Sequence, residues 1–185
     1  MRDQALSAAF STPPTHAHDT LAISSDQGST VTVTIRQAEI SDQHELAAMC
    51  ELLWPDASRE EHRRELEPIL CSGRYGTLPM AILVSHDNDG KLTGFIEVGL
   101  RSHADGCDTA QPVGFVEGWF VYEPLREQGI GKQLMRSAEA WALSHGCIEM
   151  ASDTWIDSPV SQQAHQALGF EVVDRCVHFR KPISR

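Results

Sequence analysis

A short glycine-bearing turn constrains this chain more than any other feature of its sequence. Residues 126–132 read Arg-Glu-Gln-Gly-Ile-Gly-Lys, between an apolar, strand-like run at 113–121 and a segment whose apolar residues recur at helical spacing. Where a strand turns into a helix, free backbone N–H groups and the positive helix end attract an anion, and glycine allows close approach. Arg126 and Lys132 add positive charge. The turn therefore predicts a pyrophosphate site.

Two other phosphate-binding motifs fit this turn less well. A Walker A loop needs Ser or Thr after its Gly-Lys pair, and here Gln133 follows Lys132. The dinucleotide fingerprint needs a third glycine where this chain has Leu134. The plain alternative stays open, because a lone strand–helix turn with glycines can also bind nothing.

Apolar periodicity and turn residues predict a mixed α/β domain with helices on both faces of its sheet. Two capping-box patterns, Asp42 with Glu45 and Ser58 with Glu61, predict the starts of the first two helices. Further helices are expected from the glycine turn and from Ser158, the last with Val160, Ala164 and Leu168 facing inward and Gly169 closing it. The expected strands are 31–36, 80–85, 94–100, 113–121, 148–152, and 172–177 with 178–181.

Composition limits the class of protein. The 185 residues suit one domain, predicted at 31–185, while the Ser- and Thr-rich residues 1–30 are predicted to be a disordered extension. No apolar run approaches the roughly 20 residues of a membrane span, and no signal-peptide pattern opens the chain. Five scattered cysteines indicate free thiols in a reducing cytosol, and no histidine or cysteine spacing predicts a metal site.

The net charge of the chain indicates which charge a binding partner would carry. The formal net charge is −11, from 26 acidic and 15 basic residues. This balance argues against nucleic-acid binding and favours cationic partners, although solubility alone is a sufficient reason for it.

Two landmarks give the chain a family resemblance. The pattern R-x-x-G-x-G at Arg126–Gly131 resembles the acetyl-CoA signature of the GNAT superfamily, and Ala167-Leu168-Gly169-Phe170 resembles the end of its penultimate helix. The resemblance implies the GNAT fold, with a mixed sheet of about six to seven strands. It also implies acetyl-CoA as co-substrate. The residues expected to bind it are Trp119, Phe120, Val121, Arg126, Glu127, Gln128, Gly129, Ile130, Gly131, Lys132 and Ser158.

A closer resemblance covers most of residues 33–181. The runs Phe115-Val116-Glu117-Gly118, Glu149-Met150-Ala151-Ser152-Asp153 and His165-Gln166-Ala167-Leu168-Gly169-Phe170 are similar to the chromosomal-type aminoglycoside 6′-N-acetyltransferases. The resemblance implies acetyl transfer to the 6′-amine of these antibiotics by direct attack, antibiotic resistance, a cytoplasmic location and a homodimer. The alternatives are acetylation of a polyamine or a protein N-terminus, or a non-catalytic domain that only binds acyl-CoA.

Glu117 and Asp153 are the carboxylates that the resemblance places at the substrate. Glu117 lies mid-strand, predicted on one face with Phe115 and Trp119, where an ionised carboxylate needs a cation. A substrate ammonium would supply it; an internal arginine is the alternative. Asp153 follows a strand at its carboxyl end, where α/β sheets tend to bind ligands. It is predicted to hold the amine or accept its proton, and a helix or turn cap is the alternative.

His165 stands four residues before Gly169, where many GNAT proteins carry the tyrosine that protonates the leaving thiolate. Histidine can donate a proton too, but a structural histidine bonded to a backbone carbonyl is an equal alternative. Three further residues are expected to contact substrate from their places in the resemblance: Trp54, His103 and Asp174. The alternative for Trp54 is a position in the core. Relatives carry a tyrosine near His103 and a glutamate near Asp174, so this chain departs from them at both positions.

Overall fold

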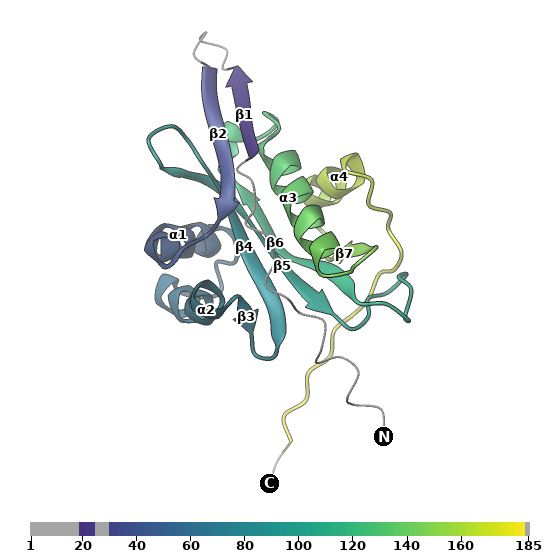
Figure 1. Cartoon of the computed structure of the whole chain (residues 1–185). Coiled ribbons are helices and arrows are strands. Elements are labelled where there is room, and N and C mark those ends of the chain that lie inside the picture. The colour runs from purple at the N-terminus through teal and green to yellow at the C-terminus, as the bar shows by residue number, and fades with distance from the viewer. Residues whose placement is uncertain (1–18, 25–29, 184–185) are drawn as a thin grey trace.

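The computed structural model describes residues 19–24 and 30–183, which form one mixed sheet with helices on both sides (Figure 1). The strands are β1 (Asp19–Ser24), β2 (Thr30–Gln37), β3 (Arg74–Tyr75), β4 (Leu78–His86), β5 (Leu92–Arg101), β6 (Val113–Val121) and β7 (Met150–Ser152). The α-helices are α1 (Gln43–Leu53), α2 (Arg59–Ser72), α3 (Ile130–Ser144) and α4 (Pro159–Ala167). Short 3-10 helices stand at Ile40–Asp42 and Glu123–Leu125.

The sheet runs β1-β2-β4-β5-β6-β7, with β3 paired to β4 outside this path. Neighbouring strands are antiparallel except β6 and β7, which are parallel. The expected mixed sheet is thereby confirmed, and the strand predicted at 113–121 coincides with β6.

Two clusters of buried apolar side chains hold the helices to the sheet. One cluster joins α1 and α2 to one face and includes Leu46, Phe95 and Phe120. The other joins α3 to the opposite face and includes Val98. The helical spacing of apolar residues predicted after the glycine turn is confirmed, since four residues of α3 at that spacing are buried: Ile130, Leu134, Ala138 and Trp141. No helix within the described ranges has the length and apolar character to cross a membrane, and all five cysteines are free thiols.

The two predicted capping boxes have different outcomes. At α2 the prediction is confirmed, because the Ser58 hydroxyl accepts from the Glu61 N–H and the Glu61 carboxylate accepts from the Ser58 N–H. At α1 the prediction is wrong. The Asp42 carboxylate binds the Arg36 guanidinium at 2.6 Å instead of capping the helix. Glu45, the other half of the expected box, accepts from the Leu92 N–H at the start of β5.

The amino-terminal side holds a strand that the sequence did not predict. Asp19–Ser24, inside the expected extension 1–30, pairs antiparallel with β2 as β1. Its apolar alternation is short and stands among Ser- and Thr-rich sequence, so the free edge of β2 is what orders it. The prediction for residues 1–18 lies outside the described residues.

The carboxyl-terminal third departs most from prediction. Residues 170–183 form no strand, so the expected strands at 172–177 and 178–181 are wrong for this chain on its own. A strand needs a partner for its backbone, and this segment leaves the sheet and projects from the body (Figure 1). Helix α4 has no buried residue, and Val160, predicted to face inward, is 68% exposed. Leu168 does pack against the core, as predicted.

Candidate active site

The turn that precedes α3 has the backbone of an anion site. Glu127 and Gly129 both adopt positive φ angles, 63° and 89°, and α3 begins at the next residue, Ile130. A non-glycine residue in this conformation is strained, and such residues concentrate at ligand sites. The Arg126 Nε atom donates to the Val121 carbonyl at 2.9 Å and so fixes the turn to the end of β6.

Gly131 and Trp119 lie in contact inside this turn. A Cβ atom on Gly131 would stand 2.7 Å from Cζ2 of the Trp119 ring. The Trp119 Nε1 atom is buried and has no hydrogen-bond partner among the described residues. A buried donor without a partner is costly, so it marks a place where a polar ligand atom is expected.

The strands diverge beside this donor. Pairing between β6 and β7 ends at Val116 and Ser152, and Trp119–Val121 continue beyond it with β5 as their strand partner. The outer edge of these residues is therefore open to an extended ligand. A hollow between α3 and α4 adds two cations next to the turn, and it is lined by Lys132, Met135, Arg136, Glu139, Ala167, Leu168 and Gly169. The donor, the open strand edge and the cations fit the pantetheine and phosphate groups of acetyl-CoA.

His165 is held against this site by contacts on both ring nitrogens. Nδ1 lies 2.8 Å from the Ser161 carbonyl, and Nε2 lies 3.0 Å from the Ser152 hydroxyl. The ring meets Trp119 and Phe170 edge to face. The backbone-carbonyl partner of the structural alternative is thus present. The same contact makes Nδ1 a donor and aims Nε2 toward the point where β6 and β7 separate.

Glu117 stands at an irregularity in β6. Strands β5 and β6 pair Glu97 with Gly118 and then Val98 with Val116, so Glu117 is an extra residue, as in a β-bulge. Its carboxylate accepts two bonds from Arg101, at 3.0 Å from Nε and 2.6 Å from Nη2. The internal arginine, the alternative reading of this residue, is therefore its partner in this structure.

The bulge also changes which residues share a face. The Arg101 guanidinium lies 3.2 Å above the Phe115 ring centroid and binds Glu117, so these two β6 residues share a face as predicted. Trp119 does not share it, because its ring packs against Gly131 and His165. The predicted alternation is wrong from the bulge onward, since an extra residue reverses the side to which the next ones point.

Trp54 joins Glu117 on the side of α1 and α2. Its ring covers Gly118, where an added Cβ atom would clash with Cη2. The Trp54 carbonyl lies 3.1 Å from Nε2 of the buried His62, which fixes the loop between α1 and α2. Trp54, Glu117, Gly118 and Arg101 therefore form one constellation, to which Glu97 of β5 belongs. We call these five residues the carboxylate face.

Glu97 is the functional candidate that the sequence analysis missed. It is 8% exposed, and neither a hydrogen bond nor an ion pair joins it to any described residue. Burial, and next the charges of Glu117 and Glu65, raise the pKa of Glu97 to about 7. A single carboxylate in the apolar run Gly94-Phe95-Ile96-Glu97-Val98 was the signal that could have found it.

The remaining predicted residues lie at the rim or apart from it. Asp153 is exposed and directly follows Ser152, the last residue of β7. Ser158 occupies the N-cap position of α4 without a side-chain cap bond. His103 is exposed in the loop after β5, and Asp174 is exposed in the projecting segment, where it accepts from the Arg175 N–H. The structure does not bring Asp174 to the carboxylate face.

The chain resembles known proteins over most of its length. Residues 46–170 match the Acetyltransferase (GNAT) family. An aminoglycoside N(6′)-acetyltransferase type 1 of Klebsiella aerogenes is 40% identical over 150 residues, covering 80% of this chain and 96% of that protein. A protein of the same name from Salmonella enteritidis is 36% identical over 149 residues, covering 80% of this chain and 97% of that protein.

Solved structures agree. The structure of AAC(6′)-Iy with the bisubstrate analog CoA-S-monomethyl-acetylneamine superposes with a TM-score of 0.73 at 34% identity, over 82% of this chain and 99% of that one. The same enzyme in complex with CoA gives a TM-score of 0.74 at 34% identity, over 83% and 97% of the two chains. The chain therefore belongs to the GNAT acetyltransferases, and within them to the aminoglycoside 6′-N-acetyltransferases.

Proposed function

We propose that this chain transfers the acetyl group of acetyl-CoA to the 6′-amine of aminoglycoside antibiotics and so confers resistance to them. The observation that carries the proposal is the open edge of β6, which runs from the glycine turn before α3 to the carboxylate face. An acyl donor along this edge would present its thioester next to groups that attract a cationic amine.

Acetyl-CoA supplies an acetyl group activated as a thioester, and the chain's own residues hold it. The backbone of Trp119–Val121 and the Trp119 Nε1 donor are proposed to bind the pantetheine arm. Residues 126–132 are proposed to bind the diphosphate through backbone N–H groups at the start of α3, with Lys132 adding charge. Ser158 is proposed to contact the cofactor from α4.

The amine side is proposed to consist of Trp54, Glu117, Asp153 and His103. An aminoglycoside carries several ammonium groups, which suits both these carboxylates and the net charge of −11. Glu117 is already bound by Arg101, but a carboxylate offers about four acceptor positions, so it can accept from a substrate as well. Asp153 is proposed to hold an ammonium group at the rim. Asp174 could join them only after its segment moves.

His165 is proposed to protonate the departing thiolate. The Ser161 carbonyl fixes its ring, and Nε2 faces the gap between β6 and β7. Substitution by alanine is expected to lower kcat by about 100-fold or less while leaving acetyl-CoA affinity nearly unchanged, because only the transition state uses the proton. An unchanged kcat across the pH range would remove this role.

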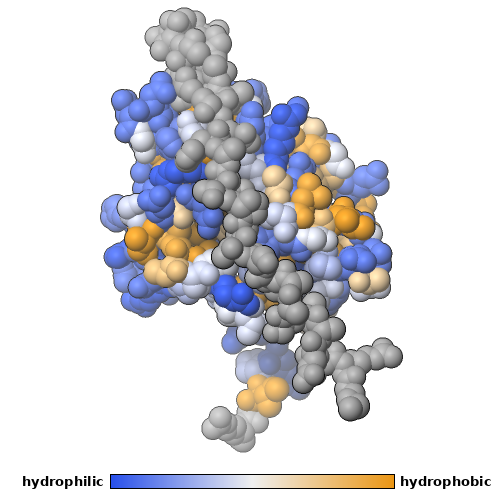
Figure 2. Space-filling model, viewed as in Figure 1, coloured by the Kyte–Doolittle hydropathy of each residue, from blue (hydrophilic) through white to orange (hydrophobic). Residues whose placement is uncertain are grey.

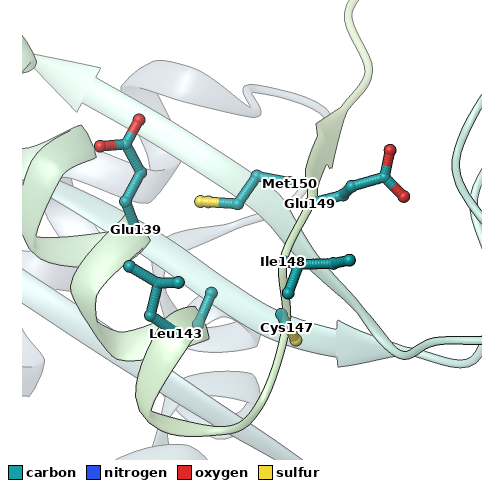
Figure 3. A pocket seen from close by; sticks show the side chains of 7 residues that line it. Glu139, Leu143, Cys147, Ile148, Glu149 and Met150 are labelled. Carbon is teal, nitrogen blue, oxygen red and sulfur yellow. The ribbon is translucent and has the colours of Figure 1, made fainter.

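We also propose that the chain works as a homodimer in the cytosol. Exposed apolar side chains gather near α4 (Figure 2), and others lie along the projecting segment. They include Trp155, Ile156, Val160, Val172, Val173, Val177, Phe179 and Ile183. An apolar hollow lies next to them at the open side of β7, where the Met150 side chain reaches toward α3 and Glu149 points away (Figure 3). A second copy would cover such surfaces. The free thiols support a reducing compartment.

The dimer has a direct test. Light scattering of the full chain is expected to give the mass of two copies, and a chain ending after Glu171 is expected to give one. A full chain with the mass of a single copy at micromolar concentration would remove the proposal.

One panel tests the proposed reaction. The purified chain is mixed with acetyl-CoA and kanamycin, tobramycin or spermidine, and thiol release is measured; mass spectrometry and NMR then locate the new amide. We expect turnover on the two antibiotics at the 6′-amine. Turnover on spermidine alone would assign the chain to polyamines, and cofactor binding without turnover on any amine would make it a binding module. A susceptible bacterium that expresses the chain should become resistant, and the Asp153→Ala variant should confer less resistance.

A further inference from the structure

Three carboxylates lie around the α1 and α2 side of β5 and β6, and they differ in how their charge is compensated. Glu117 binds the Arg101 guanidinium at 2.6 Å. Glu65 of α2 is largely exposed to water and lies 3.6 Å from the His62 ring. Glu97 is 8% exposed and has neither a cation nor a hydrogen-bond donor within the described chain.

The apolar surroundings of Glu97 do not stabilise a carboxylate, so the fold alone does not explain this residue. Its cross-strand neighbours are Ile82 of β4 and Gly118 of β6, and buried Phe95 precedes it on the same face. An unpaired carboxyl in such a place weakens the fold, whereas an apolar side chain of that size would strengthen it. Residues that are costly to the fold and lack partners concentrate where a ligand completes them.

The charged and titratable groups around Glu97 leave a net negative field. Glu117 acts on it from β6 and Glu65 from α2, and both disfavour its ionised form. Arg101 of β5 is engaged by Glu117, and His62 of α2 is engaged by the Trp54 carbonyl. From α1 the titratable neighbour is the thiol of Cys50, whose pKa burial raises first and the charge of Glu97 second. A cation that enters from outside is therefore what this group lacks.

Glu97 also lies beside the part of β6 where the acetyl transfer is proposed to occur. It pairs with Gly118, beside the bulge at Glu117 and one residue before Trp119, the first residue of the open β6 edge. Trp54 covers Gly118 on the same side, so the indole and the Glu97 carboxyl bound the same end of that edge. This is the end at which the proposed thioester meets the amine.

We propose that Glu97 is the catalytic residue that accepts the proton of the substrate's ammonium group, directly or through one water. The inference rests on the proposed acetyl transfer. A Glu97 carboxylate oxygen takes one proton from the ammonium nitrogen, which frees the nitrogen lone pair. That pair forms the bond to the acetyl carbon, and the bond from that carbon to sulfur breaks. The nitrogen gives up a second proton as the amide forms, and the sulfur takes one proton from His165, which that second proton restores. Glu97 then returns its proton to solvent, so protons and electron pairs balance.

The acid–base properties of Glu97 suit this task. A carboxylate in water titrates near pH 4 and is a weak acceptor for an ammonium proton. With its pKa raised to about 7, Glu97 holds a proton more firmly and is still ionised in an adequate fraction at neutral pH. Below that pH it is neutral and cannot accept, so the rate should fall toward acid. The exposed Asp153 then keeps a separate task, the capture of ammonium groups at the rim.

The test compares Glu97→Gln with the matched variant Glu45→Gln. Glu45 is a half-buried carboxylate on α1 that packs toward the same side of the sheet and binds the Leu92 N–H, outside the proposed machinery. Glu97→Gln should lower kcat by roughly 100-fold or more, remove the acid limb of the kcat/KM profile near pH 7, and leave the dissociation constant of acetyl-CoA within about twofold. Glu45→Gln should retain the limb and most of kcat. Loss of rate with the limb intact would mean a structural effect only and would overturn the assignment, as would an unchanged rate.

A second measurement does not depend on turnover. Binding of kanamycin or spermidine to the wild-type chain at pH 6.5, by calorimetry in two buffers of different ionisation enthalpy, should release about half a proton or more as Glu97 ionises beside the ammonium group. Glu97→Gln should release none. Proton release without turnover on either amine would sink the proposed function and keep the cation site at Glu97. Turnover with the same proton release in both proteins would sink the role of Glu97 and keep the function.

Discussion

The two faces of β6 differ in how completely the chain itself satisfies the groups placed there. On the side of α3 and α4, Trp119, Gly131 and His165 are packed together, and one donor, Trp119 Nε1, has no partner within the part of the chain that the structure describes. On the carboxylate face, Arg101 satisfies Glu117 and leaves Glu97 buried and uncompensated. The first face lacks a polar acceptor and the second lacks a cation.

This difference separates two kinds of preparation for a ligand. The α3 side is prepared by shape, because the turn, the missing Cβ of Gly131 and the open edge of β6 leave room for an extended anion. The carboxylate face is prepared by charge. Burial and nearby carboxylates disfavour the ionised form of Glu97, and a bound cation would favour it. Substitutions at Gly131 and Trp119 on the first face should therefore act on cofactor binding, and those on the second on rate, pH dependence and stability.

The largest effect is expected from Gly131→Val, which attacks the shape of the α3 side. The new Cβ would stand 2.7 Å from the Trp119 ring and push the indole into the path proposed for the cofactor. The dissociation constant of acetyl-CoA should rise by about 100-fold or more, roughly 3 kcal/mol, by calorimetry, while the circular dichroism stays that of a folded chain.

Gly146→Ala is the control for that substitution. Its added Cβ meets nothing within 4 Å, but the φ angle of 82° strains any side chain. We expect a loss of roughly 1 kcal/mol in stability with cofactor binding retained, the reverse of the Gly131 result. Retained acetyl-CoA affinity in Gly131→Val would count against the whole cofactor site.

Next in size is the effect of Glu97→Gln on stability. The pKa of Glu97 rises from 4.5 to about 7 on folding, so ionisation of this group opposes the folded state. Its penalty is absent below pH 4.5, grows as the pH rises from 4.5 to 7, and levels off at about 3 kcal/mol by pH 8. Glu97→Gln should therefore be as stable as the wild type at pH 4 and more stable at pH 8, by urea unfolding at both pH values. An equal or lower stability at pH 8 would contradict the burial of an uncompensated charge.

Local sequence was sufficient to predict elements whose determinants lie close together in the chain. Strand β6, the helical spacing of apolar residues in α3 and the start of α2 at Ser58 were all predicted correctly. Each rests on a period of two, a period near 3.6, or a reciprocal pair three residues apart. The same holds for the turn before α3, where glycines and the following helix occur in one short run.

Pairings between distant residues could not be predicted in this way. Asp42 was expected to cap α1, but Arg36, from β2, takes its carboxylate. Glu117 was expected to await a substrate cation, but Arg101, sixteen residues earlier, is its partner. Which of two carboxylates receives an arginine depends on the register of β5 and β6 and on the bulge between them. For this reason the sequence alone does not predict that Glu97 is the carboxylate left without a cation.

The expected last strands failed for a related reason. Residues 172–181 have the apolar content of a strand, and Val173 does contact the loop at Gly106, yet the segment then leaves the sheet. Sequence shows that a segment can pair, but the partner must come from the fold or from a second copy.

A moderate effect is expected at the rim, from Asp153→Asn. An exposed carboxylate gains about 1 kcal/mol or less from an ion pair with an ammonium group, so KM for kanamycin should rise by about fivefold or less. The value of kcat should change by about threefold at most, because capture and not proton transfer is lost. Steady-state kinetics beside Glu97→Gln would separate the two carboxylates. A kcat that collapses while KM holds would move the proton-accepting role to Asp153.

The smallest effect, and the one that most sharpens the contrast between the faces, is expected from Glu117→Gln. Glu117 is the second cause of the raised pKa of Glu97, after burial. Removing its negative charge, which also leaves Arg101 uncompensated, makes the Glu97 carboxylate easier to form. The acid limb of kcat/KM should therefore move to lower pH by roughly half a unit to one unit without disappearing, because burial is unchanged. The pH profile of kcat/KM for the amine measures this shift, and a limb that moves toward higher pH would show that Glu117 does not act on Glu97 through its charge.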